Sequence, residues 1–132
     1  MTKALEKISR YFASVLLFHI LKFISYFKII LIFVTMVILI KKTLSNFAEI
    51  HPLSAAPLNN WYTIVKAADW TQLADIKKVF NTMDYVGNDR YVFNIKGNDF
   101  RLVAMIFFDK RTLFIRFIGT HNEYDKIDCS TI

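Results

Sequence analysis

A histidine, a phenol and carboxylates lie within one short segment near the C-terminal end of this sequence. Thr120 and Glu123 match the capping-box pattern Ser/Thr-x-x-Glu, which predicts that a helical turn begins here. His121 then lies in the first turn, and Tyr124 and Asp125 follow it at positions that share its side of a helix. Histidine exchanges protons near neutral pH. The segment is therefore either a capped helix with a surface histidine or a site of proton transfer.

Basic side chains accompany a run of alternating apolar residues in the second half of the chain, a period typical of β-strands. Gly97 and Asn98 predict a tight hairpin turn. Asn94 and Arg101 then face each other across the hairpin, and we expect Lys96 to share their face of the sheet.

Arg116 lies on a further strand, which we expect over 112–118 after a turn at 109–111. A three-residue turn places Arg116 on the face opposite Arg101, whereas a bulge restores it to the same face. The sequence leaves both arrangements open. By themselves these residues are more typical of a solvated sheet surface than of a binding site.

The elements that position these side chains form an α+β pattern. A short buried strand is predicted over 36–41, and Thr43 is expected to cap a helix that ends at Pro52. A second helix begins near Ala55, and Thr71 is expected to cap a third. The core-facing residues predicted for the three helices are Leu44, Phe47 and Ile50, then Leu58, Trp61, Tyr62 and Val65, then Leu73, Ile76 and Phe80. Three antiparallel strands follow, with the early strand available as a fourth.

The first 35 residues differ from the rest of the chain. Of the 30 residues at 11–40, 24 are apolar, and no glycine or proline interrupts them. A bilayer span needs about 20 mostly apolar residues, so the length suffices. Lys22 and Lys28 oppose this interpretation, because a lysine at the centre of a span costs about 3 kcal/mol.

Two interpretations of residues 1–35 therefore stay open. In the first, 11–35 is a membrane anchor, and the basic residues before it place the N-terminus in the cytoplasm. In the second, residues 1–35 are a mis-assigned start, an extension translated from upstream of a native start at Met36.

Composition excludes several classes of protein. The 132 residues carry a net charge of +6, which leaves nucleic acid, the ribosome or an anionic membrane as partners. Residues 1–35 carry five basic side chains and one acidic one, so the remainder, with 12 basic and 10 acidic, is only mildly basic. The single cysteine, Cys129, excludes an internal disulfide or a zinc cluster.

Several motifs after residue 60 resemble the HigB family of toxins, part of the RelE/ParE superfamily of type II toxin–antitoxin systems. They are Trp61-Tyr62, Lys66, Ala68-Asp69-Trp70, Gly87-Asn88-Asp89-Arg90, Val92-Phe93-Asn94-Ile95-Lys96-Gly97-Asn98, Phe100-Arg101-Leu102-Val103, Phe114-Ile115-Arg116-Phe117 and Gly119-Thr120-His121. The resemblance covers 36–132, with Met36 similar to the family's usual start. Residues 1–35 match nothing in the family, which favours the mis-assigned start.

The resemblance implies a RelE-like α+β domain at 36–132, with an N-terminal strand and helices packed on a small antiparallel sheet. A hydrophobic helical extension precedes it. The resemblance also implies a cytoplasmic mRNA interferase. Such an enzyme cleaves mRNA, usually on the ribosome, without a metal or other cofactor. The partner implied is a HigA-type helix-turn-helix antitoxin. The ribose 2′-OH would attack the adjacent phosphate, which needs a base, an acid and cations.

Together the two arguments predict roles for single residues. His121 is the general acid or base, Tyr124 orients it or the leaving group, and Arg101 and Arg116 hold the scissile phosphate. The residues assigned to flanking RNA are Lys96, Arg90, Lys126 and Asn94. The roles of His121, Tyr124 and Lys126 are interchangeable at this stage. Two alternatives remain, a non-enzymatic ParE-like inhibitor and a membrane-anchored binding module.

Overall fold

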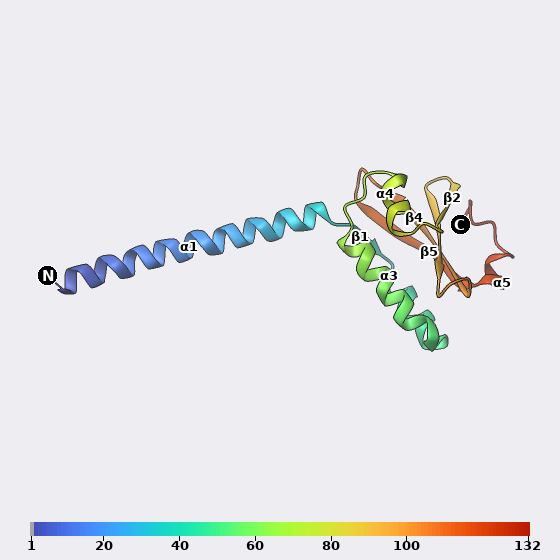
Figure 1. The fold of residues 1–132 in the computed structure, drawn as a ribbon, viewed down its shortest axis with the longest axis horizontal. Coiled ribbons are helices and arrows are strands. Elements are labelled where there is room, and N and C mark those ends of the chain that lie inside the picture. The colour runs from blue at the N-terminus through green and yellow to red at the C-terminus, as the bar shows by residue number, and fades with distance from the viewer. Residues whose placement is uncertain (1) are drawn as a thin grey trace. The chain divides into compact units, whose positions relative to one another are not determined.

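The computed structural model describes residues 2–132, which divide into an N-terminal unit ending at Val34 and a second unit, Thr35–Ile132. The first unit is one helix, α1 (Thr2–Val34), which confirms the predicted hydrophobic extension (Figure 1). Its part Thr2–Ile30 is long and apolar enough to cross a membrane, and its side chains are exposed. A signal sequence near the N-terminus can have the same length and composition as a membrane-spanning helix of this kind.

The second unit is an α+β domain, as predicted. Its helical segments are α2 (Lys42–Ile50), the 3-10 turn η1 (Pro52–Ser54), α3 (Ala55–Ala67), α4 (Leu73–Val79) and α5 (His121–Tyr124). Its strands are β1 (Val37–Leu39), β2 (Asp84–Gly87), β3 (Arg90–Ile95), β4 (Phe100–Phe107) and β5 (Thr112–Thr120). They form one sheet in the order β1-β5-β4-β3-β2 (Figure 1).

The sheet is antiparallel except at one edge, where β1 runs parallel to β5. Strand β2, which was not predicted from the sequence, pairs with β3 at the other edge. The predicted strand at 36–41 is shorter than expected and not fully buried. Ile38 packs against the core, whereas Val37 and Leu39 on its other face are exposed.

The core lies between one face of the sheet and helices α2, α3 and α4. Leu58, Trp61 and Val65 of α3 are buried, and Tyr62 packs against them, which confirms that predicted stripe. The ring centroids of Trp61 and Phe93 lie 5.4 Å apart in an edge-to-face contact, joining helix to sheet.

Two predicted caps and two predicted core residues are wrong. Helix α2 begins at Lys42 without a side-chain cap, so Thr43 lies inside the helix. Helix α4 begins at Leu73, and Thr71 instead donates from its backbone N–H and hydroxyl to the Asp75 carboxylate, 3.0 Å away in each case. Ile50 and Leu73 are exposed, because each lies at a helix end that leaves the core surface.

Candidate active site

The turn between β3 and β4 organises the site. Asn94 pairs with Arg101 in the hairpin register, as predicted, and the turn occupies 96–99. Lys96 Nζ lies 2.5 Å from Asp99 Oδ2, and the Asp99 N–H donates to the Lys96 carbonyl at 3.2 Å. Gly97, with φ of +63°, supplies the left-handed backbone conformation that this tight turn requires.

Arg101 is held against the same turn. Its guanidinium donates to the Asn98 carbonyl at 3.1 Å and to Asn98 Oδ1 at 3.4 Å. A guanidinium has five N–H donors in one plane, and these bonds with Asn98 use only some of them. The remaining donors suit a bidentate contact with a phosphate or carboxylate.

Helix α5 brings His121 to the turn. The predicted capping box is confirmed, because the Thr120 N–H donates to Glu123 Oε2 at 2.7 Å and the Glu123 N–H donates to Thr120 Oγ1 at 3.3 Å. The backbone bond from Thr120 is the main cause that lowers the pKa of Glu123, with a smaller contribution from the Thr120 hydroxyl. The His121 N–H donates to the Asp99 carbonyl at 3.1 Å, which fixes the start of α5 beside the turn.

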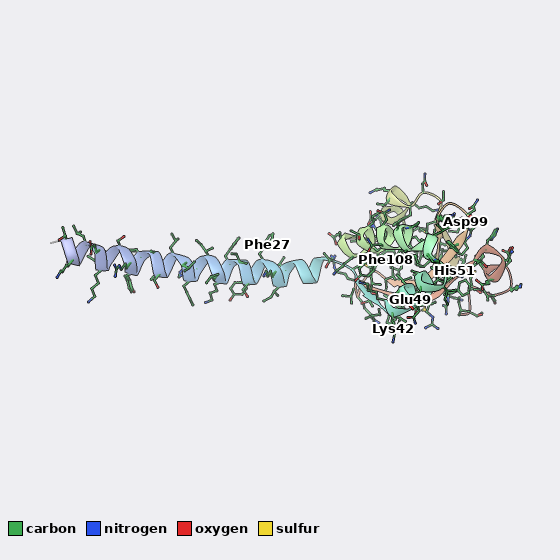
Figure 2. The ribbon with its side chains drawn as sticks, turned by 90° about the horizontal axis from the view of Figure 1, so that it is seen from below. Phe27, Lys42, Glu49, His51, Asp99 and Phe108 are labelled. Atoms are coloured by element: carbon green, nitrogen blue, oxygen red, sulfur yellow. The ribbon has the colours of Figure 1, made fainter. Side chains whose placement is uncertain are left out.

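A cavity of about 410 Å³ opens where these elements meet. Its lining residues are Leu53, Lys96, Asn98, Asp99, Phe100, Thr120, His121 and Asn122. It presents an imidazole, a carboxylate and an ammonium group to one space. His51, at the end of α2, lies beside this cavity, with its ring 5.5 Å from that of Phe100, and is labelled with Asp99 in Figure 2.

His121 and Tyr124 have different partners. His121 Nδ1 lies 3.5 Å from Asp125 Oδ1, so the nitrogen on the other side of the ring is left for chemistry. The Tyr124 hydroxyl lies 3.3 Å from Cys129 Sγ. Burial and then this contact raise the pKa of Tyr124 to about 12, while the charge of Arg101 lowers it slightly. Tyr124 therefore lies near Arg101 and is protonated at neutral pH.

Of the predicted site residues, only Lys96 and His121 line the cavity; Arg101, Tyr124, Arg116, Arg90, Asn94 and Lys126 lie outside its lining. A bulge pairs Ala104 with Ile115 and Val103 with Phe117, which leaves Arg116 as the extra, exposed residue of β5. The bulge is one of the two arrangements that the sequence left open. No described residue forms a hydrogen bond or ion pair with the Arg116 side chain.

Arg90, Asn94 and Lys126 have surroundings of their own. Arg90 Nε donates to the Ile132 carbonyl at 2.7 Å and holds the C-terminal segment against the sheet. Asn94 Nδ2 donates to the Thr82 carbonyl at 3.2 Å. The Lys126 side chain is exposed, beyond the end of α5. Of the predicted residues, the structure thus gathers His121, Lys96 and Arg101 around one turn.

Six lining residues were not predicted as site residues from the sequence, namely Leu53, Asn98, Asp99, Phe100, Thr120 and Asn122, and neither was Cys129. Asn98 and Asp99 had a signal, because they lie in and directly after the predicted turn at Gly97 and Asn98. Leu53 had none, since it comes from a segment more than 40 residues away in the chain. Cys129, considered only for disulfides and zinc, contacts Tyr124. In the part of the chain that the structure describes, no three His, Cys, Asp or Glu side chains group as a metal site.

The family profile HigB_toxin, a RelE-like toxic component of a toxin–antitoxin system, matches residues 54–127. The chain belongs to the HigB toxin family. The mRNA interferase toxin HigB of Escherichia coli K12 is 34% identical over 88 residues, which cover 64% of this chain and 84% of that protein. The mRNA interferase HigB of E. coli O6:H1 is 30% identical over 92 residues, covering 68% and 89%.

The HigB match contains the cavity almost entirely. It includes the turn at 96–99, Arg101, His121 and Tyr124, but not Leu53 or the segment that contains Cys129. It excludes α1, β1 and α2 as well. Membership of the HigB family implies an antitoxin partner.

Proposed function

We propose that this chain is the toxin of a type II toxin–antitoxin system and that it cleaves mRNA on the ribosome, inhibiting translation and growth. One observation carries the proposal. Three groups, the His121 imidazole, the Asp99 carboxylate and the Lys96 ammonium, line one cavity, and the Arg101 guanidinium on β4 binds Asn98 of the adjoining turn. The relatives named mRNA interferase support the same reaction.

The proposed reaction is a transesterification without a metal ion. The ribose 2′-oxygen attacks the adjacent phosphorus, the bond from phosphorus to the 5′-oxygen breaks, and a 2′,3′-cyclic phosphate forms. One group takes the proton of the 2′-OH and another donates a proton to the leaving 5′-oxygen. His121 on α5 and Asp99 on the 96–99 turn both line the cavity, and we assign one transfer to each.

Cations stabilise the charge that develops on the phosphate. Arg101 offers its free donors to the non-bridging oxygens, and Lys96 exchanges its bond with Asp99 for one with phosphate. Tyr124, protonated, orients the substrate by donating a hydrogen bond. We assign contacts along the flanking RNA to Arg116, Arg90, Lys126 and Asn94, where Arg90 first releases the carbonyl of Ile132.

The proposed partners follow from the same assignment. They are a HigA-type helix-turn-helix antitoxin, mRNA and the ribosome, and the proposed location is the cytoplasm. Nucleic-acid contacts by this domain depend on a local cluster of Lys and Arg, because residues 36–132 carry only two more basic than acidic side chains.

Mapping mRNA 5′ ends after induction tests the proposal. Cells that express the full chain should accumulate new ends within coding regions, and His121→Ala should abolish them. His19→Ala, in the exposed part of α1, is the matched control and should cleave like the wild type. Growth arrest without new mRNA ends would contradict the proposal and favour a ParE-like inhibitor that acts without cleaving RNA.

A further inference from the structure

The sheet face that points away from the helices carries an open apolar strip. The parallel register of β1 and β5 places Val37 and Leu39 on the same face as Phe114. In β4, Met105 pairs with Phe114 and Phe107 precedes the turn to β5, so both lie on this face too. Val37 and Leu39 are 45% and 37% exposed. We call these five residues the apolar strip.

The rest of this face is covered by the chain itself. Val92 and Val103 lie on it and are 3% and 0% exposed. The C-terminal segment returns along this side, where Asn88 Nδ2 donates to the Ser130 carbonyl at 3.3 Å and Arg90 binds the carbonyl of Ile132 (Figure 1). Within Thr35–Ile132, this C-terminal segment does not extend over the apolar strip. Val37 and Leu39 are exposed on the edge strand β1 and continue into the half-buried Phe114, Met105 and Phe107, and such a contiguous apolar surface is typical of a protein interface.

Positive charges border the apolar strip. Lys110 Nζ lies 5.5 Å from the centre of the Phe107 ring, at the turn between β4 and β5. Arg116 follows Phe114 by two residues and is exposed. Neither Lys110 nor Arg116 forms an ion pair with a described residue. The acidic residue directly before Lys110 in the sequence is Asp109. A partner with acidic side chains around an apolar centre would complement this surface.

We propose that the apolar strip is the docking surface for the antitoxin, through a segment with apolar side chains flanked by Asp or Glu. The inference rests on family membership for the existence of an antitoxin and on the proposed function for the toxicity readout. RNA fits the apolar strip itself less well, even with Arg116 at its border assigned to flanking RNA. Single-stranded RNA is bound by stacking on aromatic rings and by a groove of cations, whereas Val37, Leu39 and Met105 are aliphatic.

The test pairs toxicity with neutralisation. Leu39→Asp and Phe114→Asp are expressed in the full chain, each with and without a co-expressed HigA-type antitoxin. Both variants should still arrest growth, but the antitoxin should no longer restore it, and their affinity for purified antitoxin should fall about tenfold or more. Ile50→Asp, at an α2 position that is 75% exposed, is the matched control and should be neutralised normally.

Three results would overturn the inference. In the first, the strip variants bind and are neutralised like the wild type. In the second, they lose mRNA cleavage but keep antitoxin affinity, which would assign the strip to RNA or the ribosome. If a variant fails to fold, hydrogen exchange of the wild-type chain decides. Antitoxin should slow hydrogen exchange in β1 and β5. Unchanged hydrogen exchange in these two strands would be the third result that overturns the inference. Absence of toxicity in the wild type would instead contradict the proposed function.

Discussion

Tyr124 links the pH dependence of stability to the site. Its pKa is raised to about 12, chiefly by burial, whereas an unfolded tyrosine titrates near pH 10. Its neutral form is therefore favoured in the folded state. The stability that this supplies is complete below about pH 10 and is lost as the pH rises through about 12.

Denaturation by urea at pH 8 and pH 11 measures this effect. At pH 8 Tyr124→Phe should be less stable than the wild type by about 1 kcal/mol, because the hydroxyl contact with Cys129 is lost. At pH 11 the difference should shrink or reverse, since phenylalanine cannot ionise. Tyr11→Phe, at an exposed position of α1, should leave both values unchanged. A difference that stays constant between the two pH values would contradict the account.

Arg101 is expected to act through its planar donor fork. Arg101→Lys keeps the charge but loses the simultaneous contacts with Asn98 and a phosphate. Loss of one hydrogen bond to a charged group predicts a fall in cleavage rate of about tenfold to a hundredfold. Lys110→Arg, away from the cavity, is the control. Wild-type cleavage by Arg101→Lys in a ribosome assay would show that the fork is not used.

At the scale of elements, Gly119 sets how closely β5 approaches α5. A Cβ atom at this position would lie 2.5 Å from Phe117 Cζ and 2.9 Å from Glu123 Oε2, the oxygen of the capping box. Gly119→Ala should therefore displace the cap, with a loss of about 1–3 kcal/mol. The melting temperature should therefore fall. The cleavage rate should fall as well, because α5 carries His121. An unchanged melting temperature would mean that the neighbouring side chains move aside freely.

Local patterns were the most predictable elements. The hairpin at Gly97, the capping box and the stripe of α3 depend on residues close in sequence, and all three are confirmed. The caps at Thr43 and Thr71 were wrong because α2 begins one residue before Thr43, at Lys42, and α4 begins two residues after Thr71, at Leu73. Strand β2 was missed because four residues offer little periodicity and their pairing is set by β3.

The candidate site was predictable only where its residues belong to motifs that are local in the sequence. His121 and Lys96 could be found because both belong to local motifs, and their proximity required one correct hairpin register. The position of Leu53 in the cavity and the contact of Cys129 with Tyr124 depend on how distant segments pack. No periodicity in the sequence reports those contacts.

At the scale of the whole molecule, we expect residues 36–132 to fold without α1. Among the residues whose burial the structure describes, the hydrophobic core cluster begins with Met36 and is formed by residues of 36–132. A chain that starts at Met36 should therefore melt cooperatively and cleave mRNA like the full chain. Circular dichroism and the cleavage assay check this. Loss of cooperative melting in the shorter chain would show that α1 contributes to the fold.

The orientation of α1 gives a second prediction at this scale. Lys3, Lys7 and Arg10 precede the apolar part of α1, so a spanning helix would keep the N-terminus in the cytoplasm and place the toxin domain on the far side of the membrane. There the domain would meet no mRNA. If the full chain is toxic by cleaving mRNA, its domain should be cytoplasmic, as judged by protease protection in spheroplasts. Export of the domain together with mRNA cleavage would contradict this reasoning.

We propose that His121 and Asp99 transfer protons in the cavity at the 96–99 turn. Single-turnover cleavage of mRNA on ribosomes, in a buffer whose only divalent ion is the Mg²⁺ that the ribosome requires, tests it most directly. His121→Ala and Asp99→Asn should each slow cleavage by about 10²–10⁴ while leaving ribosome binding unchanged, and the products should end in 2′,3′-cyclic phosphate. Cleavage by both variants at the wild-type rate would place the chemistry elsewhere.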